Sequence, residues 1–183
     1  MLFRSRLGEG RDFYMQPAWN GEGARLAWVE WDHPNMPWDG TELRVAGLAF
    51  PEGGLPFVTN SRVVAGGPGT SIFQPTFGKN GELLYVSGET GWGHVHSLDL
   101  ATGEVRQVTS GEGEFGQAAW AQGQRSYAVL ADGTVVCVRS QAGFDTLHLA
   151  RGAAPGDVPL ARDRKSTRLN SSHIQKSRMP SSA

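Results

Sequence analysis

The stretch QPTFGKNGELLYVSG (residues 74–88) has two counterparts in the chain, QPAWNGEGARLAWVEW (16–31) and QAAWAQGQRSYAVLADG (117–133). Each begins with glutamine, carries an aromatic residue three positions later, passes through a polar turn that contains glycine, and ends in a run of alternating side chains. Their starts are 58 and 43 residues apart. Repeats of this length, in a sequence of short β-branched runs with 25 glycines among 183 residues, are typical of the blades of a β-propeller.

The repeated positions have a physical explanation in a stack of sheets. Asn80 and Gly81 suit a tight hairpin, in which glycine takes a positive φ. The strand after the turn has few charges on either face, as expected of a strand buried between two neighbouring blades. We therefore expect the repeated aromatic residues, Trp19, Phe77 and Trp120, to close one strand of each blade and to pack between neighbouring sheets.

These repeats predict an all-β fold, an incomplete β-propeller of about three four-stranded blades. The predicted organisation is a lead-in (1–10), three blades (11–66, 67–110 and 111–152), a linker or the start of another blade (153–162), and a tail (163–183). In the third blade we expect strands at 117–121, 126–131, 134–140 and 146–150, with a turn at Asp132-Gly133 between the second and the third. Because closure takes at least four blades, the sequence predicts either part of a larger protein or blades that close by association.

The charge of the chain is unevenly distributed. It has 17 Lys and Arg against 18 Asp and Glu, a net charge of −1, but residues 163–183 alone carry +4 and the rest −5. An acidic body without a basic stripe argues against nucleic acid or an anionic membrane as a partner. No apolar run approaches the ~20 residues needed to cross a bilayer, residues 1–10 lack the apolar core of a secretory signal, and Cys137 is the only cysteine. We expect a soluble, cytoplasmic protein.

The tail DRKSTRLNSSHIQKSRMPSSA (163–183) differs in character from the rest of the chain. It has no aromatic residue, and five basic side chains against one acidic one. Written in codons, it resembles the translation of the indexed adapter of short-read sequencing libraries, on both sides of the index. We therefore expect the tail to be adapter-derived, non-native and disordered, with the native chain interrupted near Arg162. A natural basic disordered tail is the alternative.

One loop after the first repeat is unusual, since EWDHPNMPWDGTEL (30–43) holds two tryptophans, two prolines and a histidine. Together with DFYMQPAW (12–19), SIFQPTF (71–77) and SGETGWGHVHSLDLATGEV (87–105), it resembles the N-terminal propeller of prolyl oligopeptidase family serine peptidases, of the dipeptidyl aminopeptidase or acylaminoacyl peptidase type. The resemblance covers most of residues 11–140. It implies a propeller that gates and selects short peptides for an α/β-hydrolase domain that follows it.

In that family the nucleophile lies in a G-x-S-x-G pattern at a strand-to-helix turn, and this chain has no such pattern. Residues 69–73, GTSIF, come nearest and fail at the last position. The resemblance therefore implies that the hydrolase domain is absent and that no residue of this chain is catalytic. The expected partners are a peptide substrate and the missing domain, and the oligomeric state stays open.

Two other kinds of propeller are alternatives. A TolB-like propeller has no enzymatic activity and binds protein partners, and the hairpin LDLATGE (98–104) fits it equally well. A lactonase-like propeller enzyme would need inward-facing carboxylates from several blades around a central metal, which the sequence does not identify. The loop at 30–43 favours the peptidase.

The candidate substrate-lining residues belong to this loop. They are Glu30, Asp32, His33, Trp38 and Asp39. If the loop faces the cavity between propeller and hydrolase domain, its carboxylates attract the N-terminal amine of a peptide and Trp38 offers an apolar wall. The alternative is a loop stiffened by its prolines and anchored between two strands by buried Trp31 and Trp38.

Two further patterns suggest ligands, but a turn and core packing explain them better. GEGEFG (111–116) matches the glycine pattern of dinucleotide-binding loops, but no helix follows it and its two glutamates would face the phosphates. His94 and His96 share one face of a predicted strand without an evident third ligand. We therefore expect neither a cofactor nor a metal site.

Overall fold

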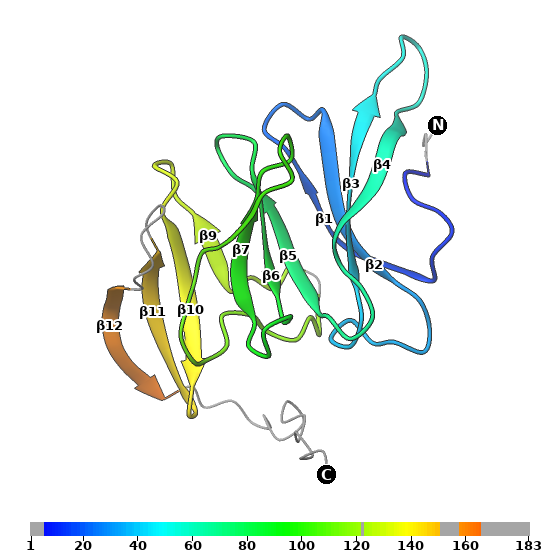
Figure 1. Cartoon of the computed structure of the whole chain (residues 1–183). Coiled ribbons are helices and arrows are strands. Elements are labelled where there is room, and N and C mark those ends of the chain that lie inside the picture. The colour runs from blue at the N-terminus through cyan, green and yellow to red at the C-terminus, as the bar shows by residue number, and fades with distance from the viewer. Residues whose placement is uncertain (1–5, 122, 151–157, 166–183) are drawn as a thin grey trace.

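The computed structural model describes residues 6–121, 123–150 and 158–165, and of the last segment only the backbone. Every regular element within these residues is a β-strand, so the predicted all-β class is confirmed. The strands form three antiparallel sheets of four strands each, which follow one another across the molecule (Figure 1). This architecture is an incomplete propeller of three blades, as the repeats predict.

Each blade is an up-and-down meander in which neighbours in sequence are neighbours in the sheet. Blade 1 contains β1 (Phe13–Trp19), β2 (Arg25–Trp31), β3 (Glu42–Ala49) and β4 (Phe57–Gly66). Blade 2 contains β5 (Ile72–Phe77), β6 (Leu83–Ser87), β7 (His94–Leu98) and β8 (Val105–Gln107). Blade 3 contains β9 (Tyr127–Val129), β10 (Val135–Gln141), β11 (Phe144–Ala150) and β12 (Val158–Lys165).

Blade 3 does not begin where the repeat predicts. Residues 117–121 form no strand, and the segment predicted as the second strand contains β9, the first strand of the sheet. Val129 pairs with Val135 across the first hairpin of the blade. The predicted strand at 117–121 and the turn near Gly123 are therefore wrong, whereas the predicted turn at Asp132 and Gly133 is confirmed as the first hairpin of the blade, with φ of 83° at Gly133.

Two of the three repeated aromatic residues are exposed, contrary to expectation. Trp19 is 50% exposed and Trp120 is 64% exposed, while Phe77 is partly buried against the core. Trp19 lies in the residue pair of the β1–β2 hairpin nearest the turn. Trp120 lies outside the strands altogether.

The main hydrophobic core lies between successive blades. Ala27 and Val29 of β2 point into it, as do Leu83 and Val86 of β6. The alternate residues of β2 face the other way and form a smaller cluster. That cluster consists of Leu26, Trp28 and Ala46, with Leu7, Leu48 and Val58 packed against it. The N-terminal segment therefore covers part of the blade 1 face that points away from blade 2.

Two glutamines join the first strands of neighbouring blades. Gln16 in β1 and Gln74 in β5 have φ of 52° and 48°, each at an irregularity in the strand register. The Gln74 N–H donates to Gln16 Oε1 (2.7 Å), and the Ser126 N–H donates to Gln74 Oε1 (2.6 Å). Gln74 Nε2 also donates to the Tyr127 carbonyl oxygen (2.8 Å). The repeated glutamine thus ties each blade to the next.

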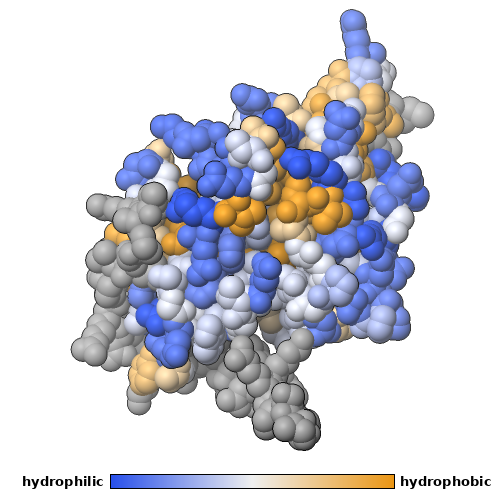
Figure 2. All heavy atoms as spheres, viewed as in Figure 1, coloured by the Kyte–Doolittle hydropathy of each residue, from blue (hydrophilic) through white to orange (hydrophobic). Residues whose placement is uncertain are grey.

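The hairpin between β3 and β4 stands out from blade 1 (Figure 1). Its large apolar side chains are exposed, Phe50 by 62%, Leu55 by 43% and Phe57 by 50%. Figure 2 shows the hairpin as an apolar region at the upper right of the molecule. This surface lies at the opposite end of β3 from the loop at 32–41.

The last strand, β12, pairs with β11 and extends blade 3 to Lys165. It occupies part of the stretch expected to be a linker (153–162) and the first three residues of the stretch expected to derive from an adapter (163–183). The rest of that tail lies outside the described residues, and so do 1–5 and 151–157. In the part of the chain that the structure describes, no helix is long and apolar enough to cross a membrane.

Candidate functional site

One rim of the blades carries the loop singled out in the sequence. We call it the loop rim and define it by residues 32–41, between β2 and β3, and 67–71, between blades 1 and 2. The Thr41 N–H donates to the Thr70 carbonyl oxygen (2.9 Å), and the Ile72 N–H donates to Thr41 Oγ1 (2.7 Å). Thr41 is fully buried, so the loop is fastened to the start of blade 2.

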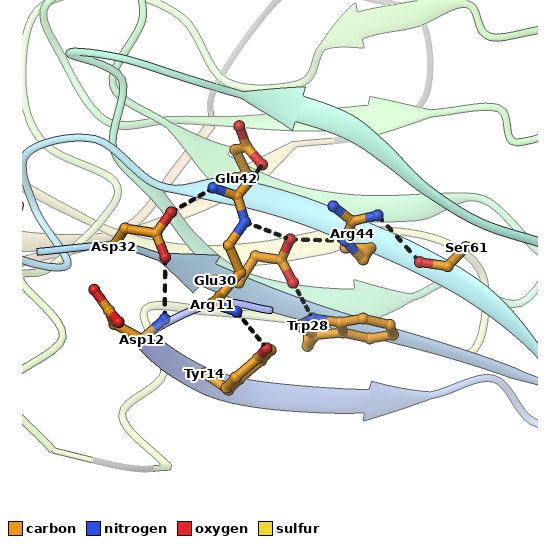
Figure 3. A network of polar contacts seen from close by, with 9 residues as sticks. All are labelled: Arg11, Asp12, Tyr14, Trp28, Glu30, Asp32, Glu42, Arg44 and Ser61. Carbon is orange, nitrogen blue, oxygen red and sulfur yellow. Dashed lines mark hydrogen bonds and ion pairs between the residues drawn. The ribbon is translucent and has the colours of Figure 1, made fainter. Parts of the chain in front are cut away.

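A network of charged side chains lies beside this rim on blade 1 (Figure 3). Glu30 is only 2% exposed. Its carboxylate accepts hydrogen bonds from Arg44 Nε (2.7 Å) and Trp28 Nε1 (2.7 Å), and Arg11 Nε lies 3.4 Å away. A buried carboxylate needs such partners, since an unpaired one would be costly. Glu30 therefore holds β2, β3 and the N-terminal segment together.

Arg11 is the centre of the network. Its guanidinium pairs with Asp32 (2.6 Å), with Glu42 and with Glu30. The hydrogen bond from Arg11, helped by one from the Asp12 N–H, lowers the pKa of Asp32 below its usual value. Asp32 thus stays ionised and is already paired with a cation. Three carboxylates face two guanidiniums, so the cluster keeps an excess of one negative charge.

Asp39 and His33 serve the local backbone. Asp39 Oδ2 accepts a hydrogen bond from the Met36 N–H (3.1 Å), and the Asp39 N–H donates to the Met36 carbonyl oxygen (2.9 Å). The His33 N–H donates to Asp12 Oδ2 (2.9 Å), and the His33–Pro34 peptide is cis. These bonds fix the fold of the loop, as the structural interpretation of this segment requires.

Trp38 points toward blade 3. Its ring lies 4.4 Å from that of Trp120, centroid to centroid, with the planes tilted by 43°. Trp38 is partly buried against the main core, whereas Trp120 is 64% exposed. Trp31, the other expected anchor, is also partly buried and stacks on Phe13 at 5.2 Å. An aromatic pair with one exposed face therefore bridges the loop rim and the segment before β9.

The five candidate residues do not converge on one pocket. Glu30 and Asp32 meet in the charged network, Asp39 and His33 organise turns, and Trp38 joins Trp120. Sequence reasoning missed three partners: Arg11, Arg44 and Trp120. The first two are 21 and 14 residues from the carboxylates they meet, and only the strand register brings them together.

The two histidines of β7 belong to the core. His94 Nδ1 lies 3.2 Å from Thr109 Oγ1, and the His96 ring, stacked on Tyr85, makes a 3.0 Å contact from Nδ1 to the His94 carbonyl oxygen. Both are buried. Among the described residues, no group of three or more His, Cys, Asp or Glu is arranged to hold a metal ion.

Sequence-based comparisons find no counterpart, since no protein-family model and no curated protein matches the chain. Solved structures do match. A puromycin hydrolase is 33% identical over 83% of this chain and 22% of its own, with a TM-score of 0.74. A puromycin-hydrolysing peptidase of Mycobacterium tuberculosis is 30% identical over 88% of this chain and 24% of its own, with a TM-score of 0.77.

A third match is more distant. Dipeptidyl peptidase 4 of Porphyromonas gingivalis is 16% identical over 77% of this chain, with a TM-score of 0.52, and shows a likeness of fold alone. The chain spans about a quarter of the length of the two puromycin-hydrolysing relatives. Its three blades are therefore similar to one part of larger hydrolases, which supports the interpretation of the chain as a fragment of a peptidase propeller.

Proposed function

We propose that this chain is a non-catalytic part of the propeller of a serine peptidase that hydrolyses short peptides, and that the propeller gates and selects the substrate. The observation that carries the proposal is the 30–33% identity to two puromycin-hydrolysing enzymes over more than four-fifths of the chain. The residues of this chain contain no G-x-S-x-G pattern, which supports the proposal that the bond-breaking residues belong to another part of the protein. We also propose a cytoplasmic location, with which the free, buried Cys137 of this chain is consistent.

The loop rim is the surface that would meet the peptide. Trp38 of this rim and Trp120 beside it, the more exposed of the two, offer an apolar wall for a substrate side chain. Asp32, 40% exposed at its side chain, belongs to a cluster with one excess negative charge, which attracts an N-terminal ammonium group. Asp39 and His33 keep the loop in shape, and Glu30 is too deeply buried to touch a substrate. Substrate contact thus narrows to Asp32 and Trp38 among the five candidates.

A grafted enzyme tests this role. Residues 6–150 replace the matching segment of the Mycobacterium tuberculosis peptidase, and KM is measured for peptides with a free or an acetylated N-terminus. Asp32→Asn is expected to raise KM for the free amine by roughly 2- to 5-fold, the range of an exposed ion pair, and to leave the acetylated peptide unchanged. Trp120→Ala is expected to raise KM for both.

Glu52→Gln is the matched control, since it removes one exposed carboxylate on the protruding β3–β4 hairpin. Equal effects of Asp32→Asn on free and acetylated peptides would refute the amine-binding role. A grafted enzyme that folds and cleaves peptides, and whose KM changes with neither Asp32→Asn nor Trp120→Ala, would favour the TolB-like alternative. In that alternative the blades bind proteins and do not select peptides.

A further inference from the structure

A small cavity lies between the first strands of blades 1 and 2 and the segment that precedes β9. Its volume is about 10 Å³, room for a single water-sized group. The lining residues are Gln16, Phe73, Gln74, Gln117, Ala119, Gln124, Arg125 and Ser126. Four of the eight are glutamines, one is arginine and none is acidic, although residues 1–162 carry an excess of five negative charges.

Blade 3 departs from its neighbours at two successive residues of this lining. The Ser126 N–H donates to Gln74 as the Gln74 N–H donates to Gln16, so Ser126 occupies the position in blade 3 that glutamine occupies in blades 1 and 2. The residue before this position is buried Met15 in blade 1 and buried Phe73 in blade 2. In blade 3 it is Arg125, which is exposed. A short side chain and a cation thus replace a long amide and an apolar residue.

The polar groups around the cavity are mainly hydrogen-bond donors. Gln74 forms the back wall, because both ends of its amide are bonded to blade 3. Gln124 Oε1 accepts a hydrogen bond from the Ala121 N–H (3.3 Å), which leaves its NH₂ group to face elsewhere. Within the described residues, Gln117 and Arg125 make no hydrogen bond or ion pair through their side chains. Amide NH₂ groups and a guanidinium without a carboxylate partner suit an anion with two acceptor oxygens.

The size of the cavity sets the kind of anion. A space for one water-sized group admits a single oxygen atom, so a carboxylate would lie at the mouth of the cavity, against exposed Arg125, with the rest of the ligand outside. The wall residue Ala119 precedes Trp120, which stacks on Trp38 of the loop rim. The segment that lines the cavity therefore also carries one ring of the aromatic pair.

We propose that Arg125, with Gln117 and Gln124, forms a subsite for the terminal carboxylate of a short peptide, next to the Trp38–Trp120 pair. The subsite rests on the proposed function in that it supplies one of the contacts by which the propeller selects short peptides. Arginine suits this task because its planar fork binds a carboxylate through two parallel hydrogen bonds. A longer chain presents an amide carbonyl at this point and forfeits the charge-assisted pair.

Calorimetric titration of the 183-residue chain tests the subsite with two probes, the dipeptide Gly-Phe and its C-terminal amide. The free acid is expected to bind roughly 5-fold more tightly than the amide, the upper end of the range for an exposed ion pair. Arg125→Gln should abolish this preference and leave far-ultraviolet circular dichroism unchanged. Arg25→Gln, an exposed arginine at the start of β2, should keep it.

Arg125→Lys provides a second test, because lysine keeps the positive charge but lacks the planar guanidinium that forms two parallel hydrogen bonds. It is expected to narrow the roughly 5-fold preference for the acid. Equal binding of acid and amide by the wild-type chain would overturn the subsite, as would a preference that survives both substitutions at Arg125. The calorimetric experiment measures binding by this chain alone and is independent of the grafted enzyme. If the chain prefers the acid while the rim substitutions leave KM of the grafted enzyme unchanged, the peptidase role is refuted and the subsite is not.

Discussion

Replacement of Gln74 by alanine removes the strongest link between blades 2 and 3. The side chain accepts a hydrogen bond from the Ser126 N–H (2.6 Å) and donates one to the Tyr127 carbonyl oxygen (2.8 Å), and all three residues are buried. Alanine leaves both backbone groups without these partners. Each buried group left unsatisfied costs about 1–3 kcal/mol, so we expect the loss of two partners in Gln74→Ala to lower the free energy of unfolding by about 2–6 kcal/mol.

The backbone at this position supplies an internal control. Gln74 has φ of 48°, a left-handed conformation that costs an L-residue about 1 kcal/mol and costs glycine nothing. Gln74→Gly should therefore be less destabilising than Gln74→Ala by about 1 kcal/mol, although both lose the same hydrogen bonds. Gln107→Ala, which removes one half-buried bond to the Thr109 carbonyl oxygen, should cost only about 1 kcal/mol.

Urea denaturation at low protein concentration, followed by tryptophan fluorescence and circular dichroism, measures these differences. The Tyr127 hydroxyl donates to the Gln74 carbonyl oxygen (2.6 Å), a backbone acceptor that alanine at position 74 also provides. This bond should therefore persist in Gln74→Ala and add nothing to the loss of stability. The account predicts the order of stability wild type, Gln107→Ala, Gln74→Gly, Gln74→Ala. A Gln74→Ala variant within about 0.5 kcal/mol of wild type, the size of an ordinary surface effect, would refute the role of this residue as an inter-blade clamp.

Three further perturbations have defined outcomes. Glu30→Ala leaves Arg44 and Trp28 without their carboxylate, and we expect a loss of about 2–4 kcal/mol in urea denaturation; a loss below 1 kcal/mol would contradict the structural role of the charged network. Burial lowers the pKa of His96 below 6.5, so the unfolded chain binds the proton more readily and stability should fall as pH drops below 6.5. The melting temperatures of wild type and His96→Gln should therefore diverge between pH 7.5 and 5 (roughly the titration range of histidine). Parallel dependence of the two melting temperatures on pH would exclude His96 as the cause. The chain exposes Phe144 and Leu147 on β11 as well as the apolar β3–β4 hairpin, so light scattering should find oligomers or aggregates; a monomer that unfolds cooperatively would show that these surfaces need no cover.

The repeat predicted the first hairpin of blades 1 and 2 but misplaced the first strand of blade 3. In the first two blades, glutamine, aromatic residue and glycine turn coincide with the first hairpin. In blade 3 the same pattern recurs at 117–123, where no strand forms, and the first hairpin forms at the second predicted turn, around Gly133. Local sequence cannot separate two glycine turns ten residues apart, because only pairing with the next strand decides which one closes a hairpin.

The candidate site was predictable in part for a similar reason. The loop at 30–43 could be singled out by its composition, and its carboxylates by their chemistry. Their cations could not, because Arg11 and Arg44 reach Glu30 only through the register of β2 on β3 and the path of the N-terminal segment. Arg125 was hidden by the misplaced repeat, which assigned the residues around it to the wrong part of the blade.

The central claim is that these blades control access to a peptidase without catalysing the reaction. The most direct measurement compares peptide hydrolysis by three proteins: this chain alone, the grafted Mycobacterium tuberculosis peptidase that carries residues 6–150, and the same enzyme with the matching segment deleted. We predict no hydrolysis by the chain alone, and cleavage of short but not long peptides by the grafted enzyme. Hydrolysis by the chain itself, or an equal preference for long and short peptides with and without the segment, would contradict the account.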